Sequence, residues 1–317
     1  MGRSELVDGI VATVPGKIGI LRALARLPPA WRSLHTYRAS AALARRTAHK
    51  PPAFVTNLGM HAGLLFEVPA DHFVALFGTP DLYAGERGAL ALAAHLSHHA
   101  DAFVDIGAHV GYFTTYVATH GRPDVPIVFL EPDVDLFRAL ERNVQASRLR
   151  HVRGFSIAVG DTDGTRPFYR NRTDSLSGSL TPMFSDRHDI DCETVAVRTF
   201  AGLATELGFR RACVKVDVEG AEAAFVAGAR PAVDRIAFLI MEVLGPAHRD
   251  GFVAKVIAET GWHAYYINDE VLEPSLDGSF QYREPEYNWL FCDRSPAALA
   301  DILKGSRLRV AESAGRS

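Results

Sequence analysis

The chain has 317 residues, 48% of them hydrophobic and 22% charged, which is an ordinary balance for a globular protein of one large domain or one domain with an extension. Its formal net charge of −3 gives no support to nucleic-acid binding as the main activity. The three cysteines are widely separated, which argues against a disulfide framework. No apolar run reaches the roughly 18 residues that a spanning helix needs, which argues against a transmembrane segment. We therefore expect a cytoplasmic protein without a signal peptide.

The first 50 residues are basic, with nine lysines or arginines against two acidic residues. Isoleucines and leucines recur among the arginines at roughly helical spacing, which predicts an amphipathic helix. Such a helix contacts a membrane surface or a partner, or it packs on the main domain or a second subunit; we favour packing. Apolar stretches at 54–55, 64–68 and 73–77 then predict β structure. We therefore predict a helical and β-hairpin extension over 1–80, a main domain over 81–305 and a polar, frayed tail over 306–317.

After a helix predicted over 84–96, strands and helices alternate as in a parallel α/β sheet. Strands are predicted at 102–106, 126–130, 155–159, 213–218, 236–242, 263–268 and 288–293. Helices between them are predicted at 111–120, 133–147, 200–207, 220–234 and 248–260. Two further apolar stretches, 166–169 and 194–198, predict an added antiparallel pair, and the polar segment 171–192 between them predicts a loop over the site. The pattern indicates an α/β fold with a seven-stranded, mostly parallel sheet and helices on both faces.

The first predicted strand of this sheet ends in a glycine loop. Asp105 is followed by Gly107 and Gly111, and apolar residues at helical spacing come next. Glycine is expected where the backbone passes close to a ligand, because a Cβ there would block the ligand or forbid the required φ. The spacing differs from the Gly-x-Gly-x-x-Gly fingerprint that a nicotinamide dehydrogenase, the rival reading, should show.

An acidic residue, Glu131, stands at the tip of the second strand, where it is placed to accept both ribose hydroxyls of an adenosine. Together with the glycine loop, it predicts an S-adenosylmethionine site. Asp161, after the third strand, is a candidate for the adenine amino group, although its Asp-x-Asp-Gly context is equally suited to a turn.

The second strong block runs from 213 to 222. Its alternating apolar residues predict a buried strand with Lys215 and Asp217 on one face. A buried lysine needs a partner, and Asp217 or another strand-tip acid is the expected one. Glu219 and Glu222 lie at the start of the next helix, where the dipole favours acidic residues in any case.

A hydroxyl acceptor needs help in losing its proton, and Asp217 is our first candidate for the base or orienting group. Glu242 and Glu219 come next, and His248 is a weaker candidate. A divalent ion bridging Asp217 and Glu242 would serve the same purpose. No compact metal motif is present, so we assign no metal ligands.

The glycine loop, Glu131-Pro132 and the Lys-Val-Asp-Val-Glu-Gly-Ala-Glu block together resemble the FkbM family of S-adenosylmethionine-dependent methyltransferases over roughly residues 83–293. The resemblance implies a class I methyltransferase (Rossmann-like) fold and O-methylation of a hydroxyl on a small sugar or secondary metabolite. His109 stands where the family usually has Asn. The resemblance implies cofactor contacts for Asp105, Gly107, His109, Gly111 and Glu131, and an active-site edge formed by Lys215, Asp217, Glu219 and Glu222.

Three alternatives stay open beside O-methylation. In the first, the methyl group goes to a nitrogen, and in the second it goes to a protein- or lipid-linked group. In the third, the chain binds the cofactor without catalysis and docks through its basic N-terminus. A second copy of the chain is a further candidate partner. Cofactor binding and turnover to S-adenosylhomocysteine separate these alternatives.

Overall fold

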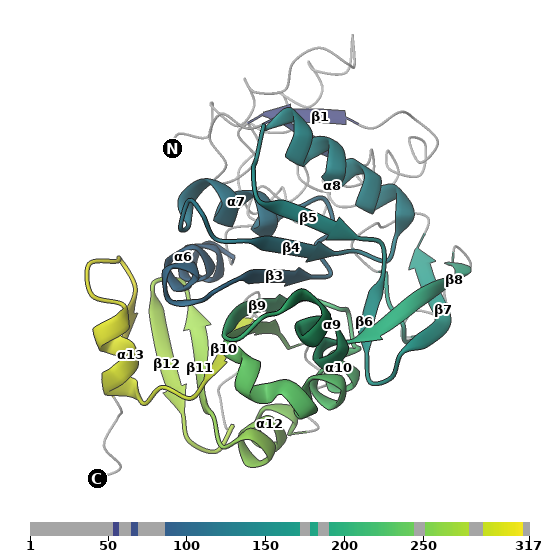
Figure 1. The fold of residues 1–317 in the computed structure, drawn as a ribbon. Helices are drawn as coiled ribbons and strands as arrows, with labels where there is room; N and C mark the ends of the chain where they lie inside the picture. The colour runs from purple at the N-terminus through teal and green to yellow at the C-terminus, as the bar shows by residue number, and fades with distance from the viewer. Residues whose placement is uncertain are drawn as a thin grey trace, which may run out of the picture.

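The computed structural model describes residues 53–56, 65–68, 86–171, 178–182, 190–243, 251–278 and 288–312 (Figure 1). The basic segment 1–50, the predicted strand at 73–77, most of the 171–192 loop and His248 lie outside the described residues. Within the described part of the chain, no helix combines the length and the apolar character needed to cross a bilayer.

The main sheet has nine strands in the order β14-β12-β11-β13-β10-β9-β3-β4-β5. Strands β5, β4, β3, β9 and β10 are mutually parallel, and β13 runs antiparallel to both β10 and β11. The bounds are β3 Phe103–Ile106, β4 Ile127–Leu130, β5 Val152–Phe155, β9 Ala212–Val216, β10 Ile236–Glu242, β11 His263–Asn268, β12 Val271–Ser275, β13 Asn288–Cys292 and β14 Arg309–Val310. The seven strands from β5 to β11 confirm the predicted mostly parallel sheet of the class I methyltransferase fold.

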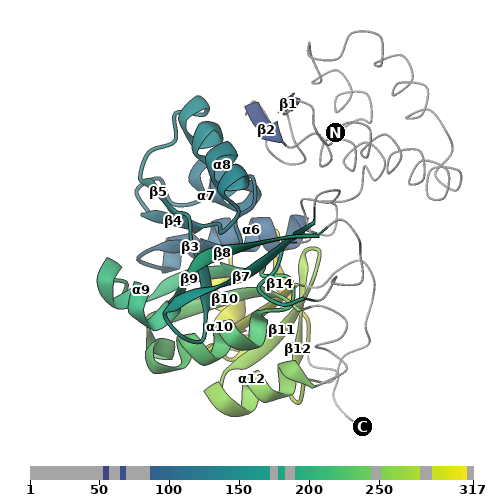
Figure 2. The ribbon, with the colours of Figure 1, turned by 90° about the vertical axis from the view of Figure 1, so that its right-hand side faces the viewer.

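Helices cover both faces of this sheet, as predicted (Figures 1 and 2). One face packs against α6 (Arg87–Leu96), α7 (Tyr112–His120), α8 (Val134–Ala146) and α13 (Pro296–Ile302). The other packs against α9 (Phe200–Leu207), α10 (Glu222–Ala229) and α12 (Phe252–Thr260). Because the central strands are buried on both faces, their sequences are nearly continuous apolar runs, and successive residues such as Phe103 and Val104 enter opposite cores.

The predicted third strand, 155–159, is wrong. The sheet strand β5 ends at Phe155, where the amide of Ile157 donates to the Phe155 carbonyl at 3.0 Å and turns the chain out of the sheet. The next strand, β6 (Ala158–Gly160), belongs to a separate three-stranded sheet in the order β6-β8-β7. In that sheet β7 (Gly164–Asn171) and β8 (Ile190–Thr199) confirm the predicted antiparallel pair.

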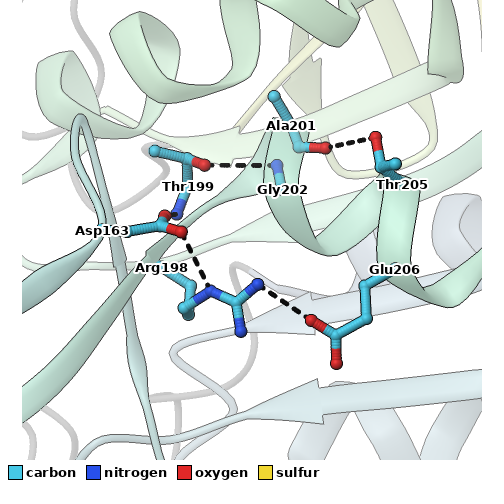
Figure 3. A network of polar contacts seen from close by, with 7 residues as sticks. All are labelled: Asp163, Arg198, Thr199, Ala201, Gly202, Thr205 and Glu206. Atoms are coloured by element: carbon cyan, nitrogen blue, oxygen red, sulfur yellow. Dashed lines mark hydrogen bonds and ion pairs between the residues drawn. The ribbon is translucent and has the colours of Figure 1, made fainter.

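A polar network fixes the passage from β8 into α9 (Figure 3). The Arg198 guanidinium lies between Asp163, at 3.2 Å, and Glu206, at 2.8 Å. The Thr199 hydroxyl accepts the Gly202 amide at 3.2 Å and so caps α9. These contacts explain why the predicted and observed bounds of this helix coincide.

Two further differences from the sequence prediction have local causes. The helix predicted over 220–234 ends at Ala229 and continues as a 3₁₀ turn over Arg230–Arg235, because Pro231 has no amide to continue the α-helical ladder. The tail is not wholly frayed, since β14 pairs with β12. Near the N-terminal end of the described residues, β1 (Ala53–Thr56) and β2 (Leu65–Val68) pair antiparallel, at the positions where the apolar stretches 54–55 and 64–68 predict β structure.

Candidate active site

The order of the main sheet reverses between β3 and β9, since β4 and β5 lie on one side of β3 and β9 and β10 on the other. Ligands of open α/β sheets bind beyond the carboxyl ends of the strands at this kind of position. A cavity opens there, and its lining includes Gly107, His109, Glu131, Asp133, Asp217 and Glu219. The structure therefore brings together residues from both predicted blocks.

The two glycines of the loop after β3 are required by close approaches. Gly107 has φ +75°, and a Cβ on it would overlap the carbonyl oxygen of Asp217. Gly111 has φ +93°, and its Cβ would overlap the Leu140 side chain on α8. The loop is thus pressed against β9 on one side and α8 on the other, and any side chain at these positions would displace it.

Asp105 fixes the start of α7 from beneath the loop. Its Oδ2 accepts the Thr114 amide at 2.8 Å and the Thr114 hydroxyl at 2.6 Å. Thr114 lies in the first turn of α7, where backbone amides have no partner within the helix. Burial raises the pKa of Asp105 to about 6, against the opposing effect of these hydrogen bonds. The cofactor contact that the family resemblance implies for Asp105 stays a prediction.

Glu131 directly follows β4 and is only 5% exposed. One carboxylate oxygen accepts the amide of His109 at 2.8 Å, and the other accepts the amide of Asp133 at 2.9 Å. Burial raises the pKa of Glu131 to about 8, although the two amides favour the charged form. His109 takes a left-handed conformation with φ +51°, which directs its amide toward Glu131.

Two lining residues beside Glu131 were not predicted. Asp133 caps α8 by accepting the amides of Asp135 and Leu136, and its Oδ2 lies 2.8 Å from Nε of Arg170 on β7. The Asp133 cap could have been found from its position before an apolar helix. No local sequence pattern identifies Arg170 as a lining residue, because its contact with Asp133 depends on the added sheet reaching α8.

Lys215 is buried, at 1% exposure, within the otherwise apolar strand β9. Its Nζ lies 3.4 Å from Oδ2 of Asp217, donates to the Val216 carbonyl at 3.2 Å and lies 4.9 Å from the centre of the Phe113 ring. The predicted pairing of Lys215 with Asp217 is therefore confirmed. Asp217 itself is 27% exposed and reaches the cavity.

Further carboxyl groups surround this pair. Burial, and then the Asp217 charge, raise the pKa of Glu242 well above its usual range, and Glu242 is hydrogen-bonded to Asp217. Burial raises the pKa of Glu86, before the first turn of α6, to about 7. Burial alone would lower the pKa of Lys215, but the carboxylates of Asp217, Glu242, Glu86 and Asp105 outweigh it and raise that pKa. Sequence reasoning missed Glu86, which lies in a stretch with no motif.

The remaining predicted residues lie in different places. Glu219 lines the cavity with φ +49°, and its carbonyl accepts the Ser179 hydroxyl at 2.6 Å. Glu222 is buried and accepts the Gly220 amide at 2.9 Å, as a helix-start acid does. Asp161 is exposed, pairs with Arg166 and does not line the cavity.

No group of three or more His, Cys, Asp or Glu side chains is arranged to hold a metal ion in the described ranges. The predicted metal bridge between Asp217 and Glu242 therefore stays a hypothesis, and the ammonium of Lys215 lies beside those two carboxyl groups. This arrangement of one buried cation among several acids is suited to hold a proton at a defined place.

A family model for the methyltransferase FkbM domain matches residues 105–273, from the end of β3 to β12. No curated protein matches the sequence. Among solved structures, precorrin-6y C5,15-methyltransferase from Geobacter metallireducens is 11% identical over 66% of this chain and 87% of its own, with a TM-score of 0.35. An S-adenosylmethionine-dependent methyltransferase from Agrobacterium tumefaciens is 10% identical over 76% and 69%, with a TM-score of 0.40. An rRNA methylase from Streptococcus thermophilus is 9% identical over 63% and 91%, with a TM-score of 0.35. Identities this low say nothing of the molecule on which this chain acts.

Proposed function

The chain belongs to the FkbM family of S-adenosylmethionine-dependent methyltransferases, and from this premise we propose that it methylates a hydroxyl group of a small sugar or secondary metabolite. The observation that carries the proposal is the position of Asp217. Its side chain reaches the cavity that the glycine loop and Glu131 line, and the ammonium of buried Lys215 backs it. A carboxylate at this place is suited to remove the proton of a hydroxyl as the oxygen attacks.

The cavity fits the cofactor in two respects. Each oxygen of buried Glu131 accepts one backbone amide, so each keeps a lone pair for one hydroxyl of a ribose. The bare backbone at Gly107 leaves room where a side chain would stand. We infer that Glu131 would hold the ribose and that Gly107 and His109 would line the rest of the site. The contacts expected from Asp105 and Asp161 stay proposals.

When bound, S-adenosylmethionine supplies an electrophilic methyl group on a positively charged sulfur. The residues of this chain prepare the acceptor. Asp217 accepts the proton of the hydroxyl, Lys215 holds the Asp217 carboxylate, and Glu242 donates a hydrogen bond to it. Burial and the Asp217 charge raise the pKa of Glu242, which favours the protonated form that can donate this hydrogen bond. General-base help of this kind contributes a factor of about 10²–10⁴ in rate.

The Asp217→Asn variant tests the base. We expect S-adenosylhomocysteine formation with a panel of methyl glycosides to fall by about 100-fold or more. The dissociation constant for S-adenosylmethionine, measured by calorimetry, should change by no more than about twofold, because the general base acts on the acceptor. Asp293→Asn is the matched control, since Asp293 pairs with Arg211 beyond the far end of β13. Unchanged turnover in Asp217→Asn rules out the base, and no cofactor binding by the wild type rules out methyl transfer itself.

A further inference from the structure

A buried polar atom beside the catalytic acids has no hydrogen-bond partner among the described residues. It is Oδ1 of Asn288, the first residue of β13, whose side chain is only 5% exposed. Buried amide oxygens in folded proteins are nearly always hydrogen-bonded, because an unsatisfied one destabilises the protein. An exception at this place calls for a functional reason.

The register of the sheet places Asn288 next to the proposed base. β13 pairs antiparallel with β10, and Asn288 lies directly opposite Glu242. Residues opposite one another in such a pair share a face, with Cβ atoms about 5 Å apart. Two positions along the same face, Leu290 and Ile240 enter the core under α6. Asn288 therefore belongs to the same edge and face as Glu242, which is hydrogen-bonded to Asp217.

The polar groups at this edge leave Asn288 without a donor. Glu86, Asp105, Asp217 and Glu242 carry carboxyl groups, and Glu242 is hydrogen-bonded to Asp217. The Lys215 ammonium is directed to the Val216 carbonyl, to Asp217 and to the Phe113 ring. Among the described residues no donor is left for the Asn288 oxygen, so we assign that donor to a ligand; the hydroxyl that reacts already gives its proton to Asp217.

We propose that Asn288 is a specificity residue that accepts a hydrogen bond from a second hydroxyl or amine of the acceptor, on a carbon close to the one that carries the reacting hydroxyl. This inference rests on the proposed function and narrows it to acceptors with two neighbouring donors. An isolated alcohol leaves the Asn288 oxygen buried and unsatisfied, and it is rejected for that reason.

Thermal unfolding of the full chain gives the first test. Asn288→Leu replaces an amide with an unsatisfied oxygen by an apolar group of similar size, so we expect its melting temperature to equal or exceed that of the wild type. The matched variant Asn143→Leu removes a buried amide that does have a partner, the Val110 carbonyl at 2.9 Å, and should melt several degrees lower. A melting temperature of Asn288→Leu that falls as far as that of Asn143→Leu shows a structural role and overturns the proposal.

Acceptor recognition gives the second test, with trans-1,2-cyclohexanediol and cyclohexanol titrated into protein saturated with S-adenosylhomocysteine. We expect the wild type to bind the diol about tenfold more tightly than the alcohol and Asn288→Leu to bind both alike. Equal binding by the wild type, or binding of neither probe, overturns the role of Asn288. Failure to bind S-adenosylhomocysteine at all would instead refute the proposed function, so the two failures are distinguishable.

Discussion

Lowering the pH from about 9 to about 6 should weaken the binding of S-adenosylmethionine by about 100-fold, because the Glu131 carboxyl has to lose a proton before both of its oxygens can accept ribose hydroxyls. In the ligand-free protein burial raises the pKa of Glu131 from 4.5 to about 8. The charges of Asp133 and Asp105 raise it further, and the amides of Asp133 and His109 oppose the rise. Two added hydroxyl donors favour the charged form, so the pKa falls on binding.

The magnitude follows from linkage. Between the pKa of the complex and about 8, each unit of pH below 8 costs a factor of ten in affinity, and two units give about 100-fold. The direction of the Glu131 pKa shift also determines how the stability of the ligand-free protein depends on pH. The contribution of a group whose pKa is raised on folding is fully present below 4.5 and is lost as the pH rises through about 8. Cofactor binding should therefore raise the melting temperature more at pH 8 than at pH 6.

Isothermal calorimetry in two buffers of different ionisation enthalpy measures both the affinity and the number of protons released. We expect close to one proton to be released near pH 6.5, and affinity to reach a plateau above about pH 8. Asp105, with a pKa of about 6, and Glu86, with a pKa of about 7, titrate in the same range. Glu131→Gln separates them: it should bind weakly and without the wild-type pH dependence. An unchanged pH dependence in Glu131→Gln, or none in the wild type, would refute the reasoning.

Two further predictions concern the packing of the site. Lys215→Met should lower the free energy of unfolding by about 3–5 kcal/mol at pH 8 and by less at pH 6, because protonation of the neighbouring acids removes the negative charges that the lost cation balanced. Denaturant titrations at the two pH values measure this difference, and a loss that does not depend on pH would contradict the prediction. Gly107→Ala should weaken cofactor binding and lower the melting temperature well beyond Gly208→Ala. The two glycines have nearly equal φ, +75° and +76°, but a Cβ on Gly107 overlaps the Asp217 carbonyl whereas one on Gly208 meets nothing within 4 Å. Equal effects in calorimetry and thermal unfolding would show that clash to be unimportant.

The main sheet could be predicted from the sequence because its strands carry a local signal. Burial on both faces makes β9 and β10 continuous apolar runs between turn residues. Where the local signal fails, the prediction fails too. The turn at Ile157 breaks an apolar stretch without a glycine or proline to mark it, and β14, at Arg309–Val310, is too short and too polar to be recognised.

The candidate site divides in the same way. Residues within the two motif blocks, such as Glu131 and Lys215, could be identified because their neighbours in sequence define their place. Glu86 and Arg170 could not, because each reaches the site from an element whose position depends on tertiary packing. Asn288 could not be identified from the sequence either, because the missing hydrogen bond of its side-chain oxygen is a property of the packed structure.

The contact between the bare backbone of Gly107 and the carbonyl of Asp217 has a consequence for protein engineering. The amide of Asp217 also donates to the Ile106 carbonyl at 2.9 Å, so the cofactor loop and the proposed base form one mechanical unit. A library that places side chains at Gly107 in search of new acceptors would displace this backbone and lose cofactor affinity along with selectivity. Asn288 lies on β13, three strands from β3, and it is the place where selectivity can be redesigned while the cofactor loop is left unchanged.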